Sequence, residues 1–92
     1  MSPIRDWARP EFEWDEANEE HILRHDVYPE EVEEVFAGNP YIRRNRDRYL
    51  VYGRDDSGPY LTVVCTGRGA RIRVITARDM NRSERSLYDR HR

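Results

Sequence analysis

Four short runs of β-branched and aromatic residues follow one another between residues 41 and 77. These residue types favour strands, and the segments between the runs contain Gly, Asn and Asp, which favour turns. Because each connection is shorter than the crossover that parallel strands need, successive strands are expected to pair as antiparallel hairpins. The sequence therefore predicts a four-stranded meander, with strands at residues 41–44, 49–53, 60–66 and 70–77.

The N-terminal part predicts one short strand followed by a helix. Residues 11–14 alternate in polarity, which places Phe12 and Trp14 on one side of a strand. Asp15 is a typical N-cap for the helix that follows, and the acidic residues after it suit the positive end of the helix dipole. We expect this helix to end near Arg24 and His25.

A second helix is predicted to begin at Pro29, because proline suits the first turn of a helix, and to end at Gly38. Its apolar residues have the i, i+3, i+4 spacing of a buried face, namely Val32, Val35 and Phe36. A third helix is predicted near the C-terminus, where Asn81 and Glu84 have the spacing of a capping box.

Together these elements predict an α+β fold, with an antiparallel β-sheet of about four strands, a short N-terminal strand, two N-terminal helices and one C-terminal helix. A chain of 92 residues is long enough for one core, so residues 1–92 are expected to form a single domain with residues 1–9 as a loose leader. We expect the helices to cover one face of the sheet and to leave the other face open for function.

Charge is strongly segregated along the chain. Residues 1–42 carry three arginines and twelve acidic residues, a net charge of −9, whereas residues 43–92 carry thirteen arginines and six acidic residues, a net charge of +7. All basic residues other than histidine are arginines, whose planar guanidinium groups can bind phosphate with two parallel hydrogen bonds. The basic second half is therefore expected to be a functional surface suited to phosphate groups, and the alternative is a solvated charged face.

The last predicted strand places two of these arginines side by side. Residues 71–76 alternate, so period two puts Ile72, Val74 and Thr76 on one face of the strand. Arg71, Arg73 and Ile75 point to the opposite face. Side chains two residues apart on a strand are roughly 6–7 Å apart, which suits successive phosphates. The alternative for each arginine is an ion pair with an acidic residue of the N-terminal half.

The remaining residues of note predict neither a disulfide nor a metal site. Cys65 is the only cysteine and lies in an apolar run, so we expect a small buried residue in a reducing compartment. His21 and His25 share a helical face but lack a third ligand, so we expect no metal and no cofactor. Neither a signal peptide nor a membrane span is evident, and the protein is expected to be cytoplasmic.

The order and spacing of several segments resemble those of the BrnT-like toxin family. The likeness covers roughly residues 11–90, and it is carried by Phe12-Glu-Trp-Asp15, Glu20-His-Ile-Leu-Arg-His25, Tyr28-Pro-Glu-Glu-Val-Glu-Glu-Val-Phe36, Arg48-Tyr-Leu-Val-Tyr-Gly-Arg54, Arg71-Ile-Arg-Val-Ile-Thr-Ala-Arg78 and Arg82-Ser-Glu-Arg-Ser-Leu-Tyr88. The resemblance implies a fold similar to RelE-type toxins and a ribonuclease that arrests growth. It also implies a DNA-binding, ribbon-helix-helix antitoxin similar to BrnA, a heterotetrameric complex, and contact with operator DNA only through the antitoxin.

A metal-independent ribonuclease uses the RNA 2′-hydroxyl to attack the adjacent phosphate, and positive charge must stabilise the phosphorane that develops. The resemblance implies Arg68, in a loop, and Arg78, at a strand end, as catalytic residues, with Arg73 next. The further RNA-binding candidates are Arg54, Arg71, Tyr52, Tyr88, Glu84 and His25. For Glu84, Tyr88 and His25, the alternative roles are helix capping or packing.

Two other classes of function also fit this sequence. The chain could be a non-catalytic module whose basic sheet binds an acidic protein or single-stranded RNA, with tyrosines for stacking. It could also be a degenerate toxin that acts only as a co-repressor. Arginines that bind phosphate serve all three functions, so growth arrest on expression is the observation that separates them.

Overall fold

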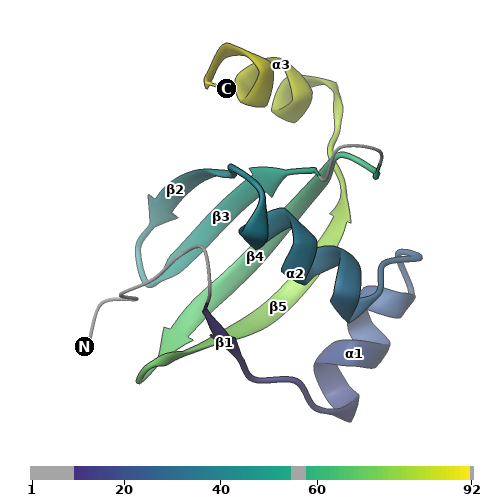
Figure 1. Ribbon diagram of the computed structural model, residues 1–92, viewed down its shortest axis with the longest axis vertical. Coiled ribbons are helices and arrows are strands. Elements are labelled where there is room, and N and C mark those ends of the chain that lie inside the picture. Colours follow the sequence, from purple (N-terminus) through teal and green to yellow (C-terminus); the bar gives the residue numbers. More distant parts are fainter. Residues whose placement is uncertain (1–9, 55–57, 92) are drawn as a thin grey trace.

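A computed structural model describes residues 10–54 and 58–91. The leader predicted at residues 1–9 lies outside the described residues. The elements in chain order are β1 (Glu11–Phe12), α1 (Glu16–Leu23), α2 (Pro29–Ala37), β2 (Tyr41–Asn45), β3 (Arg48–Gly53), β4 (Leu61–Arg68), β5 (Arg71–Asp79) and α3 (Arg82–His91). Figure 1 shows the sheet with α2 crossing one face, α1 beside β5, and α3 beyond the end of the sheet at which β5 finishes.

The sheet has five strands in the order β1-β5-β4-β3-β2. The predicted meander is confirmed, since β2, β3, β4 and β5 pair antiparallel in sequence order. The N-terminal strand makes the sheet mixed, because β1 pairs parallel with β5, with Phe12 opposite Ile72. The expectation of an antiparallel sheet with a separate short strand is corrected to one mixed five-stranded sheet.

The main core lies between one face of the sheet and helices α1 and α2. Its buried side chains come from both helices and from β3, β4 and β5, and include Phe36, Ile22, Val63, Ile72 and Ala77. None of the described helices is long and apolar enough to cross a membrane.

Helix α3 does not share the face that α1 and α2 cover. Tyr88 packs in a second cluster with Tyr52, and Leu50 lies against the same cluster. Tyr52 and Leu50 flank Val51, which belongs to the main core, and successive strand residues point to opposite faces. The expectation that all helices cover one face is therefore wrong for α3, which closes one end of the opposite face.

The predicted helix ends are confirmed. Asp15 caps α1, with its carboxylate accepting from the backbone N–H of Asn18 at 3.1 Å. Pro29 is the first residue of α2, and Gly38 is its C-cap. The capping box of α3 is formed by Asn81 and Glu84, each of whose side chains accepts from the other's backbone N–H at 2.9 Å.

Asn18 joins α1 to the sheet. It is only 4% exposed, and its side-chain oxygen accepts from the backbone N–H of Asp15 at 2.8 Å. Its side-chain nitrogen donates to the backbone carbonyls of Glu13, at 2.9 Å, and Val74, at 3.3 Å. One amide therefore satisfies backbone groups of the β1–α1 connection and of β5.

A β-bulge interrupts the pairing of β4 with β5. Cys65 lies opposite Val74 and Val64 lies opposite Thr76, which leaves Ile75 as the additional residue of β5. A bulge of this kind shifts the alternation of side chains beyond it. Ala77, rather than Thr76, is therefore buried in the main core, and the sequence-based placement of Thr76 beside the core residues is wrong.

Substituting Asn18 by Ala is expected to lower the free energy of unfolding by about 2–3 kcal/mol, because buried backbone groups lose their partners. Asn81→Ala is the control, since it removes an asparagine of a capping box at an exposed helix end and should cost about 1 kcal/mol. Urea denaturation followed by circular dichroism measures both. Equal losses in the two variants would contradict the role assigned to Asn18.

Candidate nucleic-acid interface

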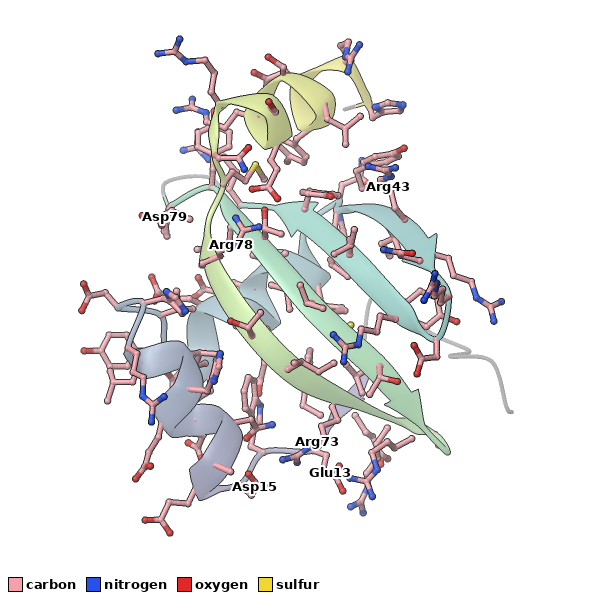
Figure 2. The ribbon with its side chains drawn as sticks, turned by 180° about the vertical axis from the view of Figure 1, so that it is seen from behind. Glu13, Asp15, Arg43, Arg73, Arg78 and Asp79 are labelled. Carbon is pink, nitrogen blue, oxygen red and sulfur yellow. The ribbon has the colours of Figure 1, made fainter. Side chains whose placement is uncertain are left out.

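The face of the sheet opposite α1 and α2 carries most of the predicted site residues (Figure 2). Strand register arranges its side chains in rows that cross the strands. Beginning at the α3 end, the rows contain Tyr41, Tyr52, Thr62 and Arg78, then Arg43, Leu50, Val64 and Thr76, then Asn45, Arg48, Thr66 and Arg73, and finally Arg68 and Arg71. We call this surface the open face.

The β5 bulge determines that Arg78 belongs to the open face. Without the additional residue Ile75, strict alternation would place Arg78 on the same side as Ile72 and Val74, which are buried in the core. With the bulge, Arg78 points to the same side as Arg73.

Arg78 is held by Glu84 from the first turn of α3. The two guanidinium nitrogens Nη1 and Nη2 donate to the two carboxylate oxygens at 2.7 and 2.9 Å, and Nη1 also donates to the backbone carbonyl of Asp79 at 3.2 Å. Burial alone raises the pKa of the Glu84 carboxyl, but hydrogen bonds from Arg78 and the Asn81 backbone outweigh burial and leave this pKa below its usual range. The carboxyl is therefore ionised at neutral pH, and the capping box of α3 fixes its position.

Polar groups of the sheet lie next to this ion pair. Strand register places Thr62 between Tyr52 and Arg78 in one row of the open face. Thr62 is fully buried, and its hydroxyl helps to lower the pKa of Glu84. The Thr62 oxygen nevertheless makes no hydrogen bond of ordinary geometry with any described residue. Guanidinium, carboxylate, phenol and hydroxyl groups thus meet beneath α3, and we call this set the Arg78 cluster.

Two of the predicted RNA-binding tyrosines are covered in this arrangement. Tyr52 is 3% exposed and Tyr88 is 6% exposed, and both pack in the cluster beneath α3. Tyr88 contacts the edge of the Tyr60 ring at a centroid distance of 6.1 Å. Sequence reasoning missed the residues at the other end of this row, where the His91 ring stacks on Tyr41 at 4.0 Å between centroids. No sequence signal pairs these two residues, because they are 50 positions apart.

Arg54 lies apart from the Arg78 pair, at the end of β3. Its guanidinium is 4.4 Å from the centre of the Tyr60 ring, and that of Arg85 is 3.9 Å from the same ring. A hydrogen bond from Arg54 is the largest contribution that lowers the pKa of the Tyr60 phenol. Tyr60 therefore holds two cations close together near the start of β4.

The other predicted arginines form a second group at the far end of the open face. Arg73 donates to Asp15 at 2.8 Å and lies 3.6 Å from Glu13, while Arg68 lies 3.3 Å from Glu13. The hydrogen bond from Arg73 is the largest contribution that lowers the pKa of the Asp15 carboxyl. Arg68 ends β4 and pairs with Arg71 across the hairpin, so its predicted place in the loop is corrected.

Arg71 also has an acidic neighbour, since its Nε is 3.7 Å from the Glu11 carboxylate. Parallel pairing places Glu11 opposite Arg71 in the sheet. The ion-pair alternative considered for these arginines is thus what the structure contains. We call Arg68, Arg71, Arg73 and their partners Glu11, Glu13 and Asp15 the paired cluster, and Figure 2 shows Glu13, Asp15 and Arg73 together at the lower end of the sheet.

The other candidate residues, His25 and Cys65, lie away from the open face. His25 follows the C-terminal end of α1, with its ring 5.9 Å from that of His21. Among the described residues, no group of three or more His, Cys, Asp or Glu side chains could hold a metal ion. Cys65 is buried, and burial raises the pKa of its thiol to about 12. The expected role of Cys65 as a small core residue is confirmed, and its protonated thiol is no nucleophile.

An α+β domain whose open sheet face carries arginines, a carboxylate and phenols has the groups that a nucleic-acid-processing protein needs. A family model described as the ribonuclease toxin BrnT of type II toxin–antitoxin systems matches residues 14–84. The chain therefore belongs to the BrnT family, which implies an RNA target and an antitoxin partner. No curated protein and no solved structure matches the chain.

Glu84→Gln is expected to lower stability by about 1 kcal/mol at neutral pH, because glutamine keeps the cap but loses the charge paired with partly exposed Arg78. Since the pKa of Glu84 is lowered in the folded state, its stabilisation is complete above the ordinary carboxyl pKa of about 4.3. It is lost as pH falls through the lowered value.

Urea titrations of both proteins between neutral and strongly acidic pH measure this difference. Glu20→Gln, which alters an exposed residue of α1, is the control and should give a difference that changes little with pH. A gap between wild type and Glu84→Gln that widens on acidification would contradict the proposed pairing.

Proposed function

We propose that this protein is a metal-independent endoribonuclease toxin and that Arg78 is its main catalytic residue. The observation that carries this proposal is the convergence of Arg78, Glu84 and Tyr52 at one end of the open face. In the proposed reaction, the RNA 2′-oxygen loses its proton and attacks the adjacent phosphorus. The bond to the 5′-oxygen then breaks, and that oxygen takes up a proton, leaving a 2′,3′-cyclic phosphate and a 5′-hydroxyl.

Arg78 suits the stabilisation of the transition state more than the binding of the substrate. In the free protein its guanidinium is satisfied by Glu84, and a phosphodiester carries only one negative charge with which to compete. The phosphorane that forms during attack carries two, so it competes better for the guanidinium. An interaction that strengthens only in the transition state accelerates the reaction. Arg68 and Arg73 are the next candidates for this role.

Glu84 and Tyr52 are proposed to serve the proton transfers or to position the RNA. The Glu84 carboxylate is ionised at neutral pH because of its lowered pKa, so it can accept the proton of the 2′-hydroxyl when phosphate displaces it from Arg78. Tyr52 is proposed as an RNA contact, with Tyr88, Arg54 and His25 as further candidates, whereas Arg71 is proposed to stay paired with Glu11. Access to Tyr52 requires movement of α3, which covers it.

We also propose the finer features that family membership suggests. Residues 1–92 would form one cytoplasmic domain with a fold similar to RelE-type toxins. Its partner would be a ribbon-helix-helix antitoxin similar to BrnA, in a heterotetramer that reaches operator DNA only through the antitoxin. The family description supports an antitoxin partner, and the five-stranded sheet with three helices supports the α+β class.

Expression of the wild-type chain alone in a bacterial host is expected to arrest growth and to degrade RNA. Arg78→Gln should relieve the arrest and lower the cleavage rate by about 10²- to 10³-fold, the usual effect of removing one donor to a developing anion. Arg90→Gln is the matched control, because Arg90 lies in the exposed last turn of α3 and should remain toxic. Arg68→Gln tests the next candidate in the same assay.

Circular dichroism must show that each variant is folded. Normal growth with abundant soluble wild-type protein would contradict the nuclease proposal. It would favour the alternative functions, a non-catalytic RNA- or protein-binding module or a degenerate toxin that acts as co-repressor.

A further inference from the structure

Six arginines of β2–β5 project from the open face, and they differ in their surroundings. Arg68, Arg71 and Arg73 lie within 3.7 Å of carboxylates from residues 11–15, and Arg78 is bound by Glu84. Arg43 and Arg48 are exposed. Across the part of the chain that the structure describes, no ion pair reaches either of them.

The carboxylates of the paired cluster are held in place by their backbone. The N–H of Glu13 donates to the Ile72 carbonyl at 2.8 Å, and its carbonyl accepts from Asn18 at 2.9 Å. On either side of Glu13, Phe12 and Trp14 pack against the main core, and the Phe12 ring contacts Phe36 at 5.0 Å between centroids. Because the backbone of this segment is anchored, the carboxylates remain beside the arginines. An RNA phosphate would therefore have to displace each carboxylate from its arginine.

The paired cluster also presents almost no net charge to RNA. It contains three arginines and three carboxylates. Glu11, Glu13 and Asp15 alternate along an extended segment, so their carboxylates are spaced roughly 6–7 Å apart and occupy positions that successive phosphates would take. The +7 charge of the second half of the chain is therefore locally cancelled at this end of the sheet.

We propose that Arg43 and Arg48 bind successive backbone phosphates of single-stranded RNA, and that the arginines of the paired cluster do not. Register places Arg43 opposite Leu50 and Arg48 opposite Asn45, which makes the two arginines diagonal neighbours on one face. Diagonal neighbours on antiparallel strands are roughly 7–8 Å apart, a separation that suits phosphates of one extended strand. The RNA would then cross β2 and β3 beside the Arg78 cluster, and Figure 2 shows Arg43 on β2, well away from Arg73.

This inference rests on the proposed RNA target but not on cleavage, so binding is measured with a probe that cannot react. The probe is a fluorescent single-stranded RNA with 2′-O-methyl groups at every position, and its anisotropy is followed from 50 to 200 mM salt. Arg43→Gln and Arg48→Gln are each expected to weaken binding by about tenfold at low salt. Each should also reduce the slope of log K against log salt by about 0.7, the value for one phosphate contact on a single strand.

The matched control is the double variant Glu11→Gln/Arg71→Gln, which removes one whole ion pair and leaves the net charge unchanged. It should bind the probe within twofold of wild type. Glu13→Gln, which frees Arg68 and Arg73 from a carboxylate, should tighten binding and increase the slope. The substituted residues are exposed, except Glu13, which is partly exposed, and circular dichroism is used to check that each variant is folded.

Several outcomes would overturn the inference. One is unchanged affinity and salt slope in Arg43→Gln and Arg48→Gln. Another is a loss of affinity in Glu11→Gln/Arg71→Gln as large as the loss in these two single variants. Either result would show that the phosphate contacts do not lie on β2 and β3. Wild-type protein that fails to bind the probe would instead refute the proposed RNA target itself. A protein that binds as expected but does not cleave unmodified RNA would refute only the nuclease proposal.

Discussion

The β-bulge in β5 decides which chemical groups can meet on this sheet. Ile75 is an additional residue between the pairs Cys65–Val74 and Val64–Thr76. It allows Ile72, Val74 and Ala77 to enter one core while Arg73 and Arg78 project from the opposite face. In an unbroken strand, Arg78 would point into the apolar core, where an unpaired guanidinium could not be accommodated. The contact between Arg78 and Glu84, and hence the cluster beneath α3, depends on this one residue.

The pairing of β1 with β5 brings acidic residues of the first half of the chain beside arginines of the second half. Parallel register brings Glu11 beside Arg71, and the following residues bring Glu13 and Asp15 to Arg68 and Arg73. The acidic first half thus neutralises one end of the basic sheet. The carboxylate ligands at this end are part of the fold, because the core packing of Phe12 and Trp14 holds their backbone in place. Cationic surface that remains available to a polyanion lies on the β2–β3 side of the open face.

Two kinds of arginine consequently share one surface, and their surroundings suit different stages of a reaction. Exposed arginines without carboxylate partners favour the binding of a singly charged diester. Arg78, which already has a carboxylate partner, gains most when a second negative charge develops on the phosphate. Placement of Glu84 in the capping box of α3 couples this ion pair to the position of the helix. Helix α3 in turn covers Tyr52.

Much of the local structure was predictable because it depends on neighbouring residues. The hairpins, the caps at Asp15 and Asn81, the start of α2 at Pro29 and the burial of Cys65 all follow from short-range spacing and composition. The resemblance of several segments also identified the family that the comparison shows. The charge count indicated a basic second half, but it could not tell which arginines would acquire carboxylate partners.

The sequence by itself determined the order of the elements, the antiparallel meander and the excess of arginine after residue 42, since each depends on residues close together in the chain. Only the tertiary structure decided the side on which Arg78 projects, the position of α3 on the face opposite α1 and α2, and the neutralisation of Arg68, Arg71 and Arg73. Each of these depends on the register between segments far apart in sequence. A shift of one residue in that register moves a side chain to the other face of the sheet, and composition and spacing do not record it.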